Sequence, residues 1–109
     1  MSYSFIPTPH FEKELKRLAK KYPSLKQDIE NLLKSLQEAP TQGAEIFKNC
    51  YKVRFAIKSK GKGKSGGGRL ITFIKIQNDR IYLLSVYDKS ERETVSDQDL
   101  KYLLRDLQE

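Results

Sequence analysis

The sequence predicts an α+β fold in which helices pack on one small, mostly antiparallel sheet. Two stretches with helical spacing of apolar residues lie near the N-terminus, three β-rich runs follow, and a last helical stretch closes the chain. The expected order is strand, helix, helix, strand, strand, strand, helix (βααβββα). At 109 residues and 38% hydrophobic content, the chain fits a single domain, residues 1–109, around one core.

The first third of the chain predicts a short strand and a helical hairpin. Residues 3–6 are aromatic and β-branched, which suits a strand. Thr8 before Pro9 is typical of a helix N-cap followed by proline at the first helical position. An apolar stripe then runs on, broken by Pro23, until Pro40, so we expect two helices with a shared apolar face. The charged side chains of residues 12–21, Glu14 among them, are expected outside this stripe.

The middle of the chain changes to a period of two. Residues 41–49 carry a weak signal and are expected to form a loop. From Lys52, apolar and basic side chains alternate, which predicts a strand with one core face and one cationic face. The apolar runs 70–76 and 81–87 complete an antiparallel meander whose middle strand is central. Ser96 is the expected N-cap of a final helix with Leu100, Leu103, Leu104 and Leu107 on its buried side.

Positive charge is concentrated in one segment. Between Ile46 and Asn78 there are nine of the 21 lysines and arginines and no acidic residue, which leaves 12 basic against 14 acidic residues elsewhere. The net charge of +7 therefore arises in this segment. Such a field attracts a phosphate backbone through steering and counterion release, although a solvated basic hairpin explains the charge equally well.

Composition argues against several classes of protein. The single Cys50 excludes an internal disulfide and a cysteine-cluster metal site, and His10 alone adds too few ligands for zinc. We therefore expect no metal and no cofactor, with Cys50 a buried structural thiol. No apolar run approaches the roughly 18 residues that span a bilayer, and the first residues lack the pattern of a signal peptide. The expectation is a cytoplasmic protein without a membrane partner.

The glycine-rich turn contains two weak nucleotide motifs. Gly61, Gly63 and Gly66 satisfy G-x-G-x-x-G, and Gly63-Lys64-Ser65 resembles the end of a phosphate-binding P-loop. Both motifs require a helix after the loop, whereas a strand is expected here. Glycines that permit close backbone approach, interleaved with lysines, suit a nucleic-acid backbone or another anionic partner better than a nucleotide pocket.

Three segments together resemble the RelE/HigB toxins of bacterial type II toxin–antitoxin modules, and the HigB-type branch in particular. They are a K-x-R strand at residues 52–54, a G-K-S-G-G-x-R turn that ends at Arg69, and a Y-x-K-x-E segment at residues 87–91. The resemblance covers essentially the whole chain. It implies a RelE-like fold of the microbial-ribonuclease type and a metal-independent endoribonuclease that cuts mRNA in the ribosomal A site and so inhibits translation.

The resemblance also implies roles for residues. The expected reaction is attack of the ribose 2′-hydroxyl on the adjacent phosphorus. Arg69 matches the cation that stabilises the scissile phosphate, and its fixed fork suits two phosphate oxygens. Lys89 is the second candidate, because strand pairing is expected to bring it near Arg69. Lys52 and Arg54 project from the cationic face, where either orients RNA or, for Lys52, carries a proton.

Tyr87 and Glu91 flank Lys89 as acid, base or base-stacking groups, although Tyr87 equally fits a core aromatic at a strand end. The remaining lysines of the basic segment are implied to contact the RNA backbone of the ribosome. These are Lys58, Lys60, Lys62 and Lys64.

The resemblance implies partners as well. They are a cognate antitoxin bound to the basic surface, the ribosome and mRNA, with the toxin a monomer or part of a toxin–antitoxin hetero-oligomer. Two alternatives stay open. A ParE-type toxin shares the fold but inhibits DNA gyrase without nuclease activity, and the G-K-S-G-G-x-R turn argues against it. A basic nucleic-acid-binding module without activity is the other alternative.

Overall fold

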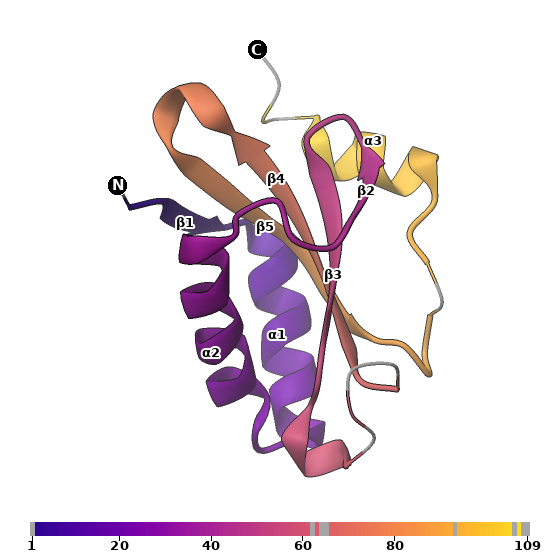
Figure 1. Cartoon of the computed structure of the whole chain (residues 1–109). Coiled ribbons are helices and arrows are strands. Elements are labelled where there is room, and N and C mark those ends of the chain that lie inside the picture. The colour runs from indigo at the N-terminus through magenta and orange to yellow at the C-terminus, as the bar shows by residue number, and fades with distance from the viewer. Residues whose placement is uncertain (1, 62, 64–65, 93, 106, 108–109) are drawn as a thin grey trace.

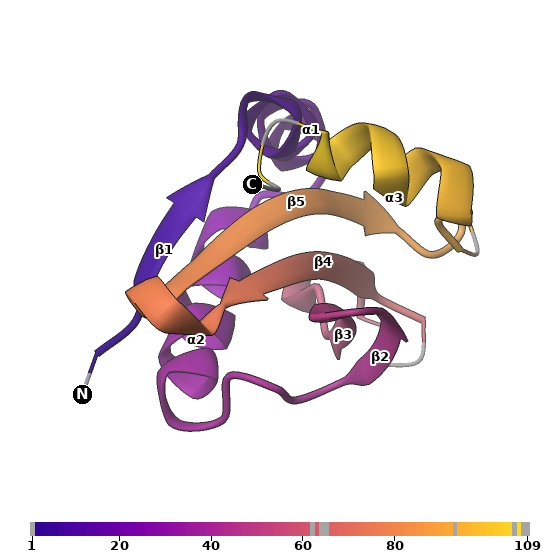
Figure 2. The same ribbon diagram turned by 90° about the horizontal axis from the view of Figure 1, so that it is seen from above.

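In the computed structural model, which describes residues 2–61, 63, 66–92, 94–105 and 107, a five-stranded sheet carries helices on both faces (Figures 1 and 2). Helices α1 and α2 cover one face and α3 the other. This arrangement confirms the α+β class. The elements in chain order are β1 (Ser4–Pro7), α1 (Pro9–Lys21), α2 (Leu25–Glu38), β2 (Ala44–Phe47), β3 (Cys50–Phe55), the 3₁₀ helix η1 (Lys58–Lys60), β4 (Gly68–Lys75), the 3₁₀ helix η2 (Ile76–Asn78), β5 (Arg80–Asp88) and α3 (Asp97–Leu104).

The strands follow the order β1-β5-β4-β3-β2. Strand β1 is parallel to β5, and the other neighbours are antiparallel, with β4 in the centre as expected for the middle of the meander. The expectation of a loop over residues 41–49 is wrong for Ala44–Phe47, which form β2 against β3. Four residues are too few to show a periodicity, and pairing with β3 rather than local sequence creates this strand.

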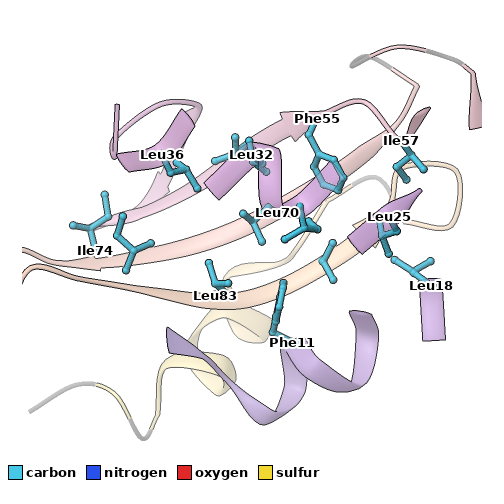
Figure 3. Close-up of a cluster of buried hydrophobic side chains, with 14 residues drawn as sticks. Phe11, Leu18, Leu25, Leu32, Leu36, Phe55, Ile57, Leu70, Ile74 and Leu83 are labelled. Atoms are coloured by element: carbon cyan, nitrogen blue, oxygen red, sulfur yellow. The ribbon is translucent and has the colours of Figure 1, made fainter. Parts of the chain in front are cut away.

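The helical hairpin begins as the sequence predicts. Thr8 caps α1, its side chain accepting the Phe11 N–H at 3.2 Å, and its hydroxyl donates to the Leu83 carbonyl at 2.9 Å, which ties the start of α1 to β5. The main core fills the space between the hairpin and the sheet (Figure 3). One expectation about this helix is wrong, because Glu14 is 9% exposed and lies on the buried side of α1.

A second core lies under α3. Ser96 caps this helix by accepting the Asp99 N–H at 3.1 Å. In Figure 1, α3 lies toward the end of the sheet that holds β2, whereas η1 lies at the opposite end. The sheet therefore has one end near α3 and another near the basic turn. The residues of this second core are Cys50, Ile71, Phe73, Tyr82, Leu84, Tyr87, Val95, Leu100 and Leu104.

Candidate active site and nucleic-acid interface

Three of the predicted site residues form one row across the sheet. Arg54 of β3 is the register partner of Arg69 of β4, and Arg69 is the register partner of Tyr87 of β5. Side chains directly opposite each other on antiparallel strands share a face, with Cβ atoms about 4.5–5.5 Å apart. Arg54 is exposed, whereas Arg69 is 3% and Tyr87 1% exposed. We call these three residues the arginine–tyrosine row.

The row places two guanidinium groups next to each other. Burial lowers the pKa of Arg69, and the charge of Arg54 lowers it further, while Tyr87 opposes the shift. An arginine nevertheless stays charged in a protein, so two like charges face each other across β3 and β4. Arg69 Nη1 donates to the Gly68 carbonyl at 2.9 Å, which orients its fork. An anion that accepts hydrogen bonds from both guanidinium groups relieves this repulsion, and a phosphate has the matching geometry.

Tyr87 brings a phenol to the same row. Its hydroxyl oxygen is buried and has no hydrogen-bond partner within the described residues. Burial raises the pKa of Tyr87 above its ordinary value, against the lowering effect of the Arg92 and Arg69 charges. The phenol therefore keeps its proton at neutral pH and has one to donate. The ring also belongs to the core under α3, which fits the core role, while the site role of Tyr87 stays a prediction.

Lys52 and Lys89 lie near the row but not in it. Lys52 is half-buried and is the register partner of Ile71. This pair lies two residues along the strands from the Arg54–Arg69 pair. Lys89 is exposed, and its backbone N–H donates to the Gly67 carbonyl at 3.1 Å. Strand pairing thus brings the Lys89 backbone next to the glycine-rich segment.

Glu91 and Lys58, two further predicted site residues, are both exposed. The carboxylate of Glu91 pairs with Arg17 of α1, with 3.3 Å between nitrogen and oxygen. The backbone N–H of Lys58 donates to buried Asp28 at 3.1 Å, which anchors η1 while the lysine side chain stays exposed. The RNA-binding role expected for Lys58 remains a prediction. Two further lysines of that set lie outside the described residues, Lys62 and Lys64.

Lys60 takes part in a buried cluster around Asp88. Asp88 is fully buried and accepts hydrogen bonds from Lys60 Nζ at 2.5 Å, the Tyr22 hydroxyl at 2.5 Å and the Ser90 N–H at 3.0 Å. Burial raises the pKa of Asp88, but these hydrogen bonds outweigh it and hold the pKa well below its ordinary value. The cluster joins η1 to the end of β5. We call it the Asp88 clasp.

Comparison with known proteins identifies the family of this chain. Residues 7–107 match the family described as the RelE toxin of the RelE/RelB toxin–antitoxin system. The chain belongs to the RelE toxin family. This membership confirms the resemblance seen in the sequence and makes the chain a toxin component of the RelE type.

Solved structures of RelE toxins share the fold. A double arginine-to-alanine mutant of Escherichia coli RelE in the free state superposes with a TM-score of 0.65 at 16% identity, covering 99% of this chain and 100% of that one. The toxin–antitoxin complex RelBE from E. coli gives 0.61 at 17% identity, covering 80% and 96%. The RelBE2 complex from Mycobacterium tuberculosis gives 0.58 at 16% identity, covering 81% and 99%.

Some glycines of this RelE-family chain allow close packing of β3 and β4, and others adopt the backbone conformations of the turn. A Cβ atom on Gly68 would lie 2.3 Å from the Phe55 ring, and one on Gly67 would lie 2.5 Å from the Phe55 carbonyl oxygen. Only glycine lets β4 start this close to the end of β3. Gly61 and Gly63 adopt left-handed φ values of +77° and +63° with open space around them. Packing against Phe55 thus explains Gly67 and Gly68 without a bound phosphate.

Three residues beside Tyr87 were not predicted as site residues. The Arg92 guanidinium lies 5.0 Å from the centre of the Tyr87 ring, and Arg92 Nη2 lies 3.5 Å from Glu14 Oε2. His10 Nε2 lies 3.1 Å from Glu14 Oε1. The spacing of four residues between His10 and Glu14 on a helix was visible in the sequence, whereas nothing local marked Arg92.

The described part of the chain contains no cluster of three or more His, Cys, Asp and Glu side chains able to hold a metal ion. Among the helices of that same part, none has the length and apolar character needed to cross a membrane.

Proposed function

We propose that this RelE-family toxin is a ribosome-dependent endoribonuclease that cleaves mRNA in the A site and so inhibits translation. The observation that carries the proposal is the arginine–tyrosine row, in which Arg54 and Arg69 face each other beside a protonated phenol. Phosphodiester cleavage through the 2′-hydroxyl is helped by cations at the phosphate and by a proton donor at the leaving oxygen, and the row offers both. Family membership supports the same assignment.

In the proposed reaction, the ribose 2′-oxygen forms a bond to phosphorus while the bond from phosphorus to the 5′-oxygen breaks. The products are a 2′,3′-cyclic phosphate and a 5′-hydroxyl. Arg69 and Arg54 neutralise the non-bridging phosphate oxygens as negative charge develops on them. Tyr87 gives its proton to the departing 5′-oxygen, and Lys52 is the group proposed to carry away the proton that leaves the 2′-hydroxyl. Protein cations supply the charge in this scheme, so it needs no metal.

The exposed lysines are proposed to dock the toxin on the ribosome. Lys58 and Lys89 lie on the surface at the same end of the sheet as the basic turn, where they can pair with ribosomal RNA phosphates. The cognate antitoxin is proposed to cover this basic surface. RelBE complexes from two bacteria share the fold, which supports an antitoxin partner for this chain.

The test is translation of a defined mRNA in a purified ribosomal system, with primer extension to map breaks. We expect A-site breaks that need ribosomes and that fall at least about 100-fold in rate in Arg54→Ala, as for loss of one preorganised donor at a developing anion. Arg54 is exposed, so this variant should fold normally. Arg80→Ala is the matched control, since Arg80 is an exposed arginine of β5 outside the row.

Absence of breaks with the unaltered chain would overturn the proposal. A DNA gyrase assay then tests the ParE-type alternative. Salt-sensitive RNA binding without any cleavage product would instead identify a binding module.

A further inference from the structure

Glu14 is a buried carboxylate surrounded by four groups that donate hydrogen bonds or carry nitrogen atoms close to it. Its side chain is 10% exposed. Oε1 accepts the Ser85 hydroxyl at 2.6 Å and the Val86 N–H at 3.2 Å, and it lies 3.1 Å from His10 Nε2. Oε2 pairs with Arg92 at 3.5 Å.

Two of these contacts satisfy hydrogen-bond donors at the edge of the sheet. Strand β1 pairs with β5 only as far as Leu83, so the next part of β5 has an outer edge that faces α1. Glu14 satisfies the Val86 N–H on that edge and the neighbouring Ser85 hydroxyl. Both are neutral donors, and a glutamine would accept from both. The edge therefore explains an oxygen acceptor at position 14 but not a buried negative charge, which is costly unless it is paired.

Arg92 explains the charge. Its side chain is 40% exposed and stands on a turn in which the Arg92 N–H donates to the Asp88 carbonyl at 3.3 Å. An exposed arginine samples many rotamers unless other groups hold it. Here the carboxylate of Glu14 fixes one side of the guanidinium and the Tyr87 ring fixes its face.

The held guanidinium lies beside the row. Tyr87, which Arg92 overlies, is the register partner of Arg69, so a third guanidinium group approaches the phenol already flanked by Arg69. A guanidinium has five N–H donors, and one ion pair leaves donors for a further acceptor. Because the side chain is partly exposed, that acceptor can come from solvent or from a bound ligand.

We propose that Arg92 is a further RNA-contacting residue of this site, which binds a phosphate of the RNA next to the cleaved bond, and that Glu14 is the positioning residue that holds it over Tyr87. The inference deepens the proposed nuclease function and rests on it. It assigns a binding role to a guanidinium and a carboxylate outside the three sequence motifs.

Two variants separate this role from a structural one. Glu14→Gln keeps the acceptor for Val86 and Ser85 but removes the charge that holds Arg92. Arg92→Ala removes the guanidinium itself. Glu45→Gln is the matched control, because Glu45 also accepts a backbone N–H, from Asn49 at 3.2 Å, and has no arginine partner in the part of the chain that the structure describes.

The first readout is the rate of mRNA cleavage on ribosomes. We expect Glu14→Gln and Arg92→Ala each to slow cleavage by about 10- to 100-fold, as for loss of one interaction of a charged group with the reacting phosphate. The double variant should be no slower than Arg92→Ala alone, because Glu14 acts through Arg92. The cleavage rate of Arg92→Lys should lie between those of the unaltered chain and Arg92→Ala, since lysine keeps the charge but not the forked guanidinium. Thermal unfolding of each variant shows that the fold is intact.

The second readout is binding of a labelled single-stranded RNA oligonucleotide as a function of salt. Removal of a negative charge strengthens RNA binding in general, and Glu45→Gln measures that effect. The inference predicts the opposite sign for Glu14→Gln, namely weaker binding, and a salt slope lowered by about one phosphate contact for Arg92→Ala.

These readouts distinguish two failures. If the unaltered chain cleaves mRNA while Glu14→Gln and Arg92→Ala cleave and bind RNA as it does, the inference is wrong and the nuclease function stands. If the unaltered chain does not cleave but both variants bind RNA more weakly, the nuclease proposal is wrong while the phosphate contact stands. Tighter RNA binding by Glu14→Gln would overturn the positioning role.

Discussion

Replacement of Asp88 by asparagine tests the Asp88 clasp. Asp88 is fully buried, and the Lys60 side chain that it pairs with is 11% exposed. Asparagine keeps nearly the same shape and one oxygen acceptor for Lys60 or Tyr22. It leaves the Lys60 ammonium, in a mostly buried place, without a counter-charge.

The expected cost follows from this burial. Removal of one partner from a buried ion pair destabilises a protein by about 3–5 kcal/mol. Lys60 stands on a short surface helix and can turn toward water, so the low end, about 3 kcal/mol, is expected for Asp88→Asn. That is a large share of the roughly 5–15 kcal/mol by which a domain is stable.

The same pair gives a pH dependence of defined sign. Burial raises the pKa of Asp88, but the hydrogen bonds from Lys60, Tyr22 and Ser90 outweigh it, so the folded-state pKa lies below the unfolded one. The clasp therefore stabilises the protein fully above the ordinary aspartate pKa of about 3.9, and its contribution is lost as pH falls below that toward the folded-state value. The unaltered chain should lose more stability than Asp88→Asn between neutral pH and pH of about 3.

Urea unfolding followed by far-UV circular dichroism at neutral and acidic pH measures both effects. Asp79→Asn is the control, because Asp79 has a left-handed φ of +51° that asparagine adopts equally well. Exposed ion pairs contribute up to about 1 kcal/mol. If the unfolding free energy of Asp88→Asn at neutral pH lies within about 1 kcal/mol of that of the unaltered chain, the reasoning is refuted. Identical acid sensitivity of the two proteins would refute the pH argument on its own.

Three further predictions use other features of the fold. Gly68→Ala should lower stability by about 1–3 kcal/mol, because its Cβ would meet the Phe55 ring at 2.3 Å; thermal unfolding checks this, and an unchanged midpoint would contradict it. Burial raises the pKa of Cys50 to about 12, so iodoacetamide should leave the native protein unmodified at pH of about 8 and label it only after unfolding; rapid native labelling would be the contrary result. Tyr87→Phe should slow cleavage about 100-fold or more, because it removes the proposed proton donor. The unfolding free energy should change little, because within the described residues the hydroxyl has no hydrogen-bond partner to lose. Undiminished cleavage would mean that Tyr87 serves only as a core aromatic.

The sequence predicts helix boundaries well because caps and breaks are local. Thr8 and Ser96 cap their helices as expected, and Pro23 separates the hairpin helices. Strand β2 escapes prediction because its existence depends on pairing with β3. The burial of Glu14 was accessible in principle, since it stands three residues after Phe11 and four before Leu18 on the apolar stripe, but its charge suggested a solvent-facing place.

The site is harder to predict because the register of pairing between β3, β4 and β5 decides which side chains lie opposite one another. Alternation places Lys52 and Arg54 on one face of β3, and this much the sequence predicts. Which residue faces Arg54 depends on the length of the turn before β4, and which faces Arg69 depends on an irregularity in pairing next to Ile71. Neither quantity is encoded in a motif. Arg92 lies in an irregular segment after β5, where no period exists to place its side chain.

The end of β5 explains how one basic segment serves two purposes. Tyr87 and Asp88 are consecutive on this strand, so their side chains point to opposite faces of the sheet. Tyr87 meets the arginines of the row on the α3 face, and Asp88 meets Lys60 and Tyr22 in the clasp. Part of the positive charge is thus neutralised inside the protein and fixes the turn, while Arg54 stays exposed beside buried Arg69. The clasp holds η1, where the turn starts, against the same strand end that carries the phenol, and the RNA contacts proposed for this end of the sheet depend on that anchor.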